Sequence, residues 1–263
     1  TKDDVHAAAG GSTAASSAPV AASAPTSAPA AAGPSAPSRY VAPSAPSGRE
    51  ERTPLKGLRK IIAENMVQSA FTAPHFTYVE EVDATELVAL RSRLRAPAKE
   101  RGTDMSYLPI IMKAVAIMLR EHPILNAMLD DSTQEIVKKF YYNLGIAVAL
   151  DNGLLVPVVR NADEQSVLAL GKSIADLGQR ARTKKLMPNE VDGVTFSITN
   201  PGIFGSQWGT PIIPQPTVAI LGVGTIEKRV RVVTLPDGTD TMGIRLCGYL
   251  TLGFDHRVID GAV

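Results

Sequence analysis

Cysteine is nearly absent from this sequence, which contains one, Cys247, among 263 residues. A single cysteine excludes a disulfide framework within the chain and zinc sites built from Cys-x-x-Cys pairs. Neither sign of charge is in excess, because 27 Lys and Arg stand against 26 Asp and Glu and leave a net charge of +1. So close a balance removes the case for binding nucleic acid or an anionic membrane surface, since both need a concentrated positive field.

Long apolar runs and nucleophile motifs are missing as well. No uninterrupted apolar stretch approaches the ~20 residues of a membrane-spanning helix, and no basic-then-apolar signal segment opens the sequence. The serine motif Gly-x-Ser-x-Gly and the phosphate-loop motif Gly-x-x-x-x-Gly-Lys are both absent. We therefore expect a soluble, cytoplasmic protein without a metal site, whose chemistry needs no nucleophile from the protein.

The first fifty residues differ in composition from the rest. They contain 16 Ala, 9 Ser, 7 Pro and 4 Gly, so they have too few large apolar side chains to form a core. Frequent prolines also oppose helix formation. We predict a disordered Ala/Pro/Ser-rich linker over 7–50, with an inert tail as the alternative. A linker joins two domains, which leaves 1–6 as a domain remnant and 51–263 as one folded domain.

The folded part mixes helices and strands without a regular alternation, which favours an α+β fold over a doubly wound α/β fold. Apolar spacing predicts helices over 58–71, 85–94, 107–119 and 167–182, with Pro54 as an early residue of the first. Residues 144–150 and 154–159 flank an Asp-Asn-Gly turn and predict a hairpin. Further strands are predicted over 76–83, 194–199, 218–223, 230–235 and 244–252.

Four histidines are the main candidates for proton transfer. His6 lies at the edge of the linker, and we interpret His75 and His122, beside prolines at the ends of elements, as structural. His256 differs because it follows an apolar strand, and Asp260 lies four residues later. A turn there could bring the carboxylate to the imidazole ring or to the neighbouring arginine. The alternative is a strand end capped by an Asp–Arg ion pair.

A histidine base without a protein nucleophile indicates activation of the substrate's own thiol, hydroxyl or water. Such a reaction passes through an oxyanion and needs a hydrogen-bond donor aimed at it. Residues 195–202 supply hydroxyls and an amide where a predicted strand meets a Gly/Pro-rich loop. The basic cluster at 180–185, which ends a predicted helix, is interpreted as complementing the helix dipole, with an anionic cofactor as the alternative.

Residues 255–261 read Asp-His-Arg-Val-Ile-Asp-Gly, which resembles the active-site signature of dihydrolipoamide acyltransferases, the core components of 2-oxo acid dehydrogenase complexes. The short His-x-x-x-Asp-Gly pattern is shared with chloramphenicol acetyltransferases and indicates only the superfamily. The narrower resemblance rests on further segments in the family's order: 54–63, 74–77, 81–83, 122–127, 153–159 and 196–200. Pro201, after Asn200, departs from the smaller residue of many members.

The resemblance implies a chloramphenicol-acetyltransferase-like α+β fold, a two-layer sandwich with a mixed sheet. It implies homotrimers with active sites at subunit boundaries, assembled into larger cores. The implied reaction moves an acyl group from S-acyl-dihydrolipoamide to coenzyme A. The loop 205–213 favours an acetyl or branched-chain group and leaves succinyl as the alternative. His256 is then the general base, Thr199 donates to the oxyanion from the neighbouring subunit, and Asp260 supports the histidine loop. Residues that bind coenzyme A stay unassigned.

The resemblance also implies partners. These are the 2-oxo acid decarboxylase, dihydrolipoamide dehydrogenase, and a lipoyl domain upstream of this sequence that carries the lipoyl group. Residues 1–6 resemble the end of a peripheral-subunit-binding domain, and 51–263 resemble a catalytic domain truncated at its C-terminus. Two alternatives are a free-standing acetyltransferase, which would need no swinging linker, and a non-catalytic core protein, which would not need both His256 and Thr199.

Overall fold

The structure, a computed structural model, describes residues 50–150 and 153–262. The predicted domain remnant and nearly all of the predicted linker lie outside these residues. Residues from Thr53 onward form one compact unit. Its largest element is a seven-stranded sheet in the order β1–β11–β9–β8–β4–β7, with β10 paired to the free half of β11. The strands are β1 (His75–Asp83), β4 (Leu144–Ile146), β7 (Val158–Val159), β8 (Phe196–Thr199), β9 (Ala219–Val223), β10 (Glu227–Thr234) and β11 (Asp240–Asp255).

The sheet is mixed. Strand β8 pairs in parallel with both β4 and β9, and the other strand pairs of the sheet are antiparallel. Two smaller pairs accompany it, β2 (Ala127–Asp130) with β3 (Glu135–Lys138) and β5 (Val148–Leu150) with β6 (Gly153–Leu155). The helices are α1 (Gly57–Thr72), α2 (Thr85–Glu100), α3 (Leu108–Glu121) and α4 (Val167–Arg182). Short 3₁₀ turns are η2 (Pro123–Asn126), η3 (Pro188–Glu190) and η4 (Pro201–Phe204).

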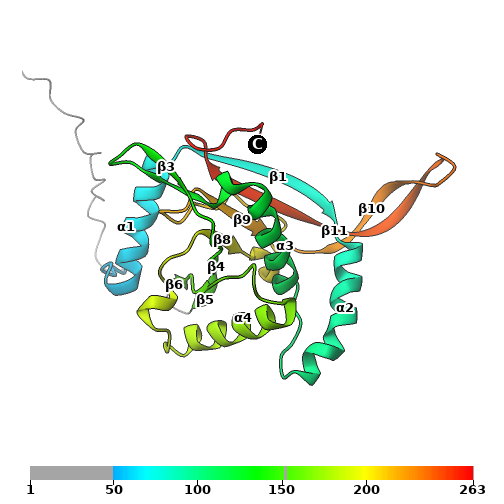
Figure 1. Cartoon of the computed structure of the whole chain (residues 1–263), viewed down its shortest axis with the longest axis horizontal. Helices are drawn as coiled ribbons and strands as arrows, with labels where there is room; N and C mark the ends of the chain where they lie inside the picture. Colours follow the sequence, from blue (N-terminus) through cyan, green and yellow to red (C-terminus); the bar gives the residue numbers. More distant parts are fainter. Residues whose placement is uncertain (1–49, 151–152, 263) are drawn as a thin grey trace, which may run out of the picture. The chain divides into compact units, whose positions relative to one another are not determined.

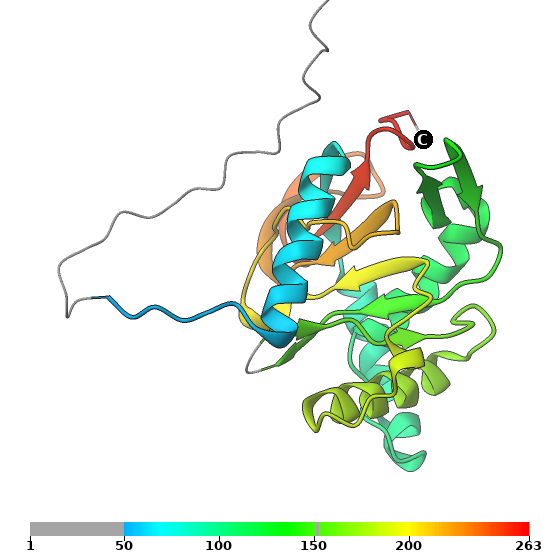
Figure 2. The ribbon, with the colours of Figure 1, turned by 90° about the vertical axis from the view of Figure 1, so that its left-hand side faces the viewer.

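The two faces of the sheet have different cover. On one face the large side chains of alternate strand positions, such as Phe196 and Leu221, pack in the core with Met112 and Leu119 of α3. Figure 2 shows α1 crossing the other face, in front of the strands. This two-layer α+β arrangement with a mixed sheet confirms the predicted fold class. No helix among the described residues is long and apolar enough to span a membrane.

Local signals explain where the helices begin and end. The Ser166 hydroxyl accepts a hydrogen bond from Ala169 N and caps α4, which spans the predicted range 167–182. The Asp83 carboxylate accepts from Thr85 N at 2.9 Å, as expected for a residue at the start of α2. The prediction for Pro54 was wrong, because α1 begins at Gly57.

The long strand β11 serves two partners in turn. Its second half lies between β1 and β9, and its first half pairs only with β10 and projects from the body as a two-stranded arm (Figure 1). Four apolar side chains on one face of this arm are 67–81% exposed: Val230, Val232, Met242 and Ile244. A two-stranded ribbon is marginally stable in water and exposed apolar patches of this kind often bind a partner, so this face is a candidate interaction surface.

Candidate active site

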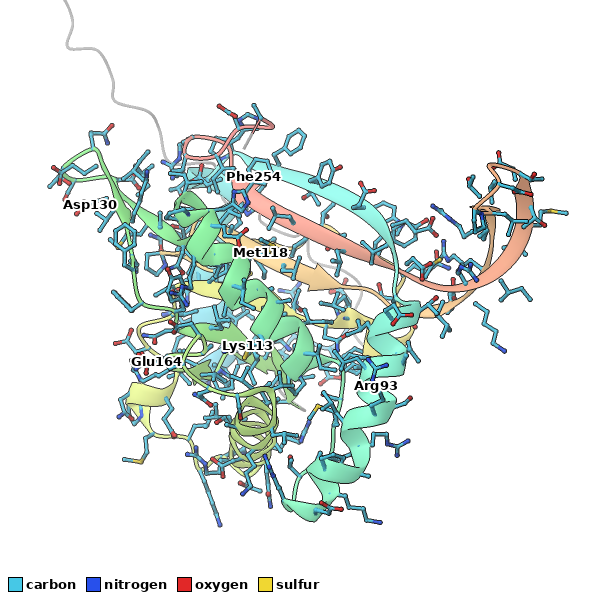
Figure 3. All side chains as sticks on the ribbon, turned by 45° about the vertical axis from the view of Figure 1, so that its right-hand side comes forward. Arg93, Lys113, Met118, Asp130, Glu164 and Phe254 are labelled. Carbon is cyan, nitrogen blue, oxygen red and sulfur yellow. The ribbon has the colours of Figure 1, made fainter. Side chains whose placement is uncertain are left out.

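His256 follows β11 directly, on a loop whose backbone is fixed at several points. Its N–H donates to Pro74 O at 2.9 Å, and Asp255 N donates to Val218 O at 2.8 Å. The imidazole ring itself is exposed. It lies edge-on to Phe76, with ring centroids 5.3 Å apart, and its centroid is 5.8 Å from that of Phe254. Phe254 lies near the end of β11 (Figure 3). Backbone hydrogen bonds thus hold the loop in place while the imidazole ring stays accessible to a ligand.

An ion pair holds this loop, but its carboxylate is Asp255 and not Asp260. Asp255 is 2% exposed, and the Arg257 guanidinium donates to both of its oxygens, the shortest bond being 2.7 Å. Arg257 also donates to Asp131, in the β2–β3 turn, at 3.0 Å. The hydrogen bond to Asp255 raises the pKa of Arg257 above its ordinary value. Arg257 therefore connects the histidine loop to a second hairpin.

Asp260 is exposed, and its carboxylate accepts a hydrogen bond from Ala262 N at 3.0 Å. This bond closes the turn that ends the His256 loop. Among the described residues Arg257 pairs with other carboxylates, so the structure does not bring Asp260 to the arginine. A role for Asp260 in supporting the loop stays a prediction.

The other two histidines of the described part occupy ends of elements. His75 Nδ1 lies 2.7 Å from Ala73 O, and its Nε2 lies 3.0 Å from Ile213 N. Both contacts are hydrogen bonds when Nδ1 carries the proton, so the ring links α1 to the loop before β9. The structural interpretation of His75 is confirmed. His122 is exposed and caps α3 through its backbone N–H, which donates to Met118 O.

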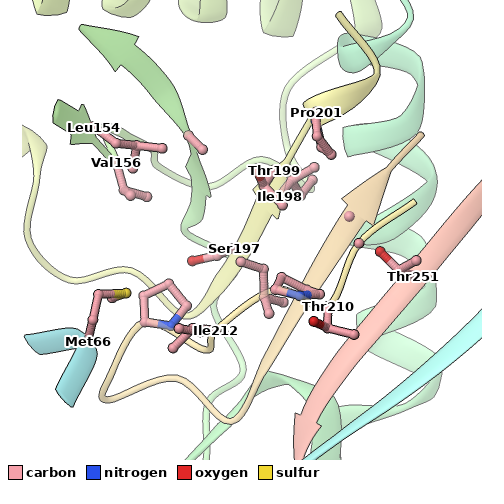
Figure 4. A pocket seen from close by; sticks show the side chains of 16 residues that line it. Met66, Leu154, Val156, Ser197, Ile198, Thr199, Pro201, Thr210, Ile212 and Thr251 are labelled. Atoms are coloured by element: carbon pink, nitrogen blue, oxygen red, sulfur yellow. The ribbon is translucent and has the colours of Figure 1, made fainter. Parts of the chain in front are cut away.

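Thr199 ends β8 and lines a cavity of about 400 Å³ on the α1 side of the sheet (Figure 4). The floor consists of strand residues, and Met66 of α1 with the segment 209–214 completes the walls. Most of the lining is apolar, with hydroxyls from Ser197, Thr199, Thr210 and Thr251. The cavity therefore fits a slender, mainly apolar chain that carries few polar groups.

His256 and Thr199 lie far apart within one chain. Thr199 pairs with Gly222 of β9, and Gly222 pairs with Thr251 of β11, so the three form a row across the sheet. His256 is five residues beyond Thr251. At ~3.3 Å per residue along a strand and ~4.8 Å between strands, roughly 19 Å separate the two backbones. If both residues act on one reacting carbonyl, they come from different chains.

The basic cluster that ends α4 is partly neutralised. Arg180 pairs with Asp176 at 2.7 Å and with Glu190 of η3 at 2.5 Å. Two further basic residues, Arg182 and Lys184, border a separate surface cavity. Within the described ranges, no group of three or more His, Cys, Asp or Glu side chains is arranged to hold a metal ion.

Residues 47–263 match the sequence profile of the 2-oxoacid dehydrogenases acyltransferase (catalytic domain) family. The chain belongs to this family. A relative, the dihydrolipoyllysine-residue acetyltransferase component of the pyruvate dehydrogenase complex of Bacillus subtilis (strain 168), is 45% identical over 224 residues, 84% of this chain and 50% of the relative. The chain thus spans about half the length of the curated relatives it matches.

Two solved structures resemble this acyltransferase domain closely. One is dihydrolipoamide acetyltransferase of Azotobacter vinelandii, from a study of a serine, a histidine and an asparagine in its catalytic mechanism. The other is the cubic core of a pyruvate dehydrogenase multienzyme complex. Each has a TM-score of 0.77 and 39% identity, and each match covers 84% of this chain and 91% of the other.

Sequence reasoning about the acyltransferase domain missed two features of the site. It offered Asp260 as a carboxylate that could orient the His256 ring or hold Arg257, and it named no aspartate for the alternative of a strand end capped by an Asp–Arg ion pair, which the structure forms with Asp255. It included Ser197 among the hydroxyls of 195–202 without singling it out. The alternation of β8 was the available signal, because it points Ser197 and Thr199 to the same face.

Proposed function

We propose that this chain transfers an acetyl group from S-acetyl-dihydrolipoamide to coenzyme A, as the catalytic core of a 2-oxo acid dehydrogenase complex. Family membership and the two acetyltransferase relatives support the proposal. The observation that carries it is the exposed His256 ring on a loop that backbone bonds and the Arg257–Asp255 pair hold in place. That arrangement suits a general base that must meet a substrate thiol.

In the proposed reaction, neutral His256 removes the proton from the thiol of coenzyme A. The thiolate attacks the thioester carbonyl of the acetyl donor, and the carbonyl oxygen becomes an oxyanion. The Thr199 hydroxyl donates to this oxyanion. Collapse of the intermediate breaks the bond to the dihydrolipoyl sulfur, and that sulfur takes the proton from the imidazolium. No group of the protein is consumed.

The spacing of the candidate residues supports these roles. In the Azotobacter study the histidine and the asparagine stand four positions apart, as His256 and Asp260 do here. Asp260 is the acidic counterpart of that amide. Its bond to Ala262 N supports a role in shaping the loop, and it is not assigned a proton-transfer step.

We also propose that the chain assembles as a homotrimer and that each active site joins His256 of one subunit to Thr199 of the next. The separation of roughly 19 Å within one chain supports a shared site. The apolar face of the β10–β11 arm supports self-association. The cubic core of the related complex is an assembly of the same kind of domain.

The proposed partners follow from the reaction. A lipoyl domain brings the acetyl group, a 2-oxo acid decarboxylase loads it, and dihydrolipoamide dehydrogenase reoxidises the released dithiol. The proposed location is the cytoplasm, or the mitochondrial matrix in a eukaryote.

The test is the rate at which the assembled full-length protein forms acyl-coenzyme A from S-acetyl-, S-isobutyryl- and S-succinyl-dihydrolipoamide. We expect the acetyl donor to give the highest kcat/KM. Loss of a general base costs about 10²–10⁴-fold, so His256→Ala should reduce kcat by that factor with each donor. Full activity of His256→Ala would contradict the proposed mechanism, and preference for succinyl would contradict the proposed substrate.

A further inference from the structure

The sheet face below the cavity is hollow because its side chains are small. Ser197, Gly222 and Thr251 occupy the floor, and Gly145 lies beside Ser197. The walls are apolar and include Met66, Leu154, Val156, Pro211, Ile212 and Ile220. Figure 4 shows Ser197 and Thr199 on the same strand, and Ser197 is the more buried of the two.

Among these small and apolar side chains, Ser197 carries a buried hydroxyl without a hydrogen-bond partner among the described residues. The residue is 2% exposed, and its hydroxyl has no hydrogen-bond partner within the part of the chain that the structure describes. Buried hydroxyls are rarely left without a partner, because the group has lost its bonds to water. None of the described residues that line the cavity supplies a partner, so the hydroxyl is free to bond to a ligand there.

The geometry of β8 indicates how far from Thr199 the ligand group that bonds to Ser197 lies. Ser197 and Thr199 are two residues apart on β8 and face the same side, so their side chains are about 6.6 Å apart. If Thr199 donates to the reacting carbonyl, the ligand group that bonds to Ser197 lies about 6.6 Å from that carbonyl along the bound chain. The ligand must therefore carry a polar group a short distance from its sulfur.

We infer that the Ser197 hydroxyl binds the secondary amide nearest the thiol of coenzyme A, in its pantetheine arm. This inference rests on the proposed function. In that arm two carbons separate the sulfur from the amide nitrogen, so the amide lies roughly 4–6 Å from the sulfur with ordinary bond lengths. In the dihydrolipoyl arm at least five carbons separate either sulfur from the amide carbonyl, which puts that amide beyond the reach of Ser197.

The test compares Ser197→Ala with the wild-type full-length protein in its assembled state. Loss of one hydrogen bond should raise KM for coenzyme A about tenfold with little change in kcat. KM for S-acetyl-dihydrolipoamide should not change. Two small thiols give the sharper comparison: N-acetylcysteamine keeps the amide, and pentane-1-thiol lacks it. Ser197→Ala should lower kcat/KM about tenfold for the first thiol and leave the second unaffected.

Controls separate this inference from the proposed function. Ser173→Ala removes a hydroxyl of α4 that donates to Gln165, away from the cavity, and should leave the reaction of both thiols unaffected. Ser197→Cys keeps the volume with a weaker donor and should give an intermediate effect if Ser197→Ala folds poorly. Equal effects on both thiols, or a change only in KM for the dihydrolipoyl donor, would overturn the inference. Absence of acyl transfer in the wild-type protein would instead overturn the proposed function.

Discussion

At the scale of single residues, the presentation of His256 depends on a carboxylate that water hardly reaches. Asp255 accepts hydrogen bonds from the Arg257 backbone N–H and from its guanidinium. Burying a carboxylate is unfavourable unless it is paired, so Arg257 offsets the burial of Asp255. The pair therefore stabilises the loop together with its backbone hydrogen bonds.

We predict that Arg257→Ala destabilises the domain by about 3 kcal/mol, because it leaves the Asp255 carboxylate buried and unpaired. For a domain of this size the thermal midpoint should fall by roughly 6–12 °C. kcat should fall with it. The matched control is Asp131→Ala, which removes the exposed partner of the same guanidinium and should cost less than about 1 kcal/mol. Equal losses in the two variants, measured by calorimetry, would contradict this role for Asp255.

A second prediction concerns pH and the Glu190–Arg180 pair. The hydrogen bond from Arg180 lowers the pKa of the Glu190 carboxyl below its ordinary value of 4.5. A carboxyl with a lower pKa in the folded state stabilises that state above the unfolded pKa, and the contribution disappears as pH falls through the folded pKa.

Glu190→Gln should therefore lower the thermal midpoint at neutral pH. The difference from the wild-type protein should shrink as the pH falls below about 4.5. Thermal midpoints across this pH range give the answer. A difference that is constant with pH would show that the carboxylate charge is not what stabilises the contact between α4 and η3.

At the scale of elements, the sequence predicted those whose signals are local. The hairpin over 144–150 and 154–159 is one antiparallel register, from Leu144↔Val159 to Leu150↔Gly153. Its ladder breaks in the middle, where Pro157 has no N–H and Ala147 N donates to Ile198 O instead. The pair β2–β3 was missed because all four residues of β3 are exposed and show no alternation of apolar and polar side chains.

The candidate site was only partly predictable. The motif pattern predicted His256, Asp260 and Thr199 as site residues. It could not predict which carboxylate pairs with Arg257, because that depends on the burial of Asp255 at the end of β11. The unpartnered hydroxyl of Ser197 also depends on which side chains surround it in three dimensions. Patterns along a chain carry neither kind of information.

Gly224, which follows β9, lets the loop after Thr199 pack closely against the end of that strand. A Cβ added to Gly224 would lie 1.8 Å from Gln207 O, a backbone atom of that loop. Gly224→Ala should displace the loop, cost about 1–3 kcal/mol and lower kcat. The control is Gly178→Ala in α4, whose nearest neighbour would be 3.8 Å away. Alanine there should stabilise the helix by up to about 1 kcal/mol and leave kcat unchanged. Unchanged kcat in Gly224→Ala would contradict the importance of this contact.

At the scale of the whole molecule, the proposed shared active site and the apolar face of the β10–β11 arm both predict contact with a second copy of the chain. Val232 and Met242 are directly opposite each other on the apolar face. The double variant Val232→Lys with Met242→Lys should keep its far-ultraviolet circular dichroism but sediment as a smaller species. Thr241→Lys, on the other face of the arm, is the control and should assemble normally. Normal assembly of the double variant would show that the arm is not an interface.

The most direct measurement of the central claim mixes two inactive variants. His256→Ala and Thr199→Val chains are assembled together by co-expression, and acyl transfer to coenzyme A is measured. If each site takes His256 from one subunit and Thr199 from the next, random mixing leaves about a quarter of the sites with both residues, and about a quarter of the wild-type rate returns. If both residues act within one chain, no site is complete and the mixture stays as inactive as its parents, which would contradict the account.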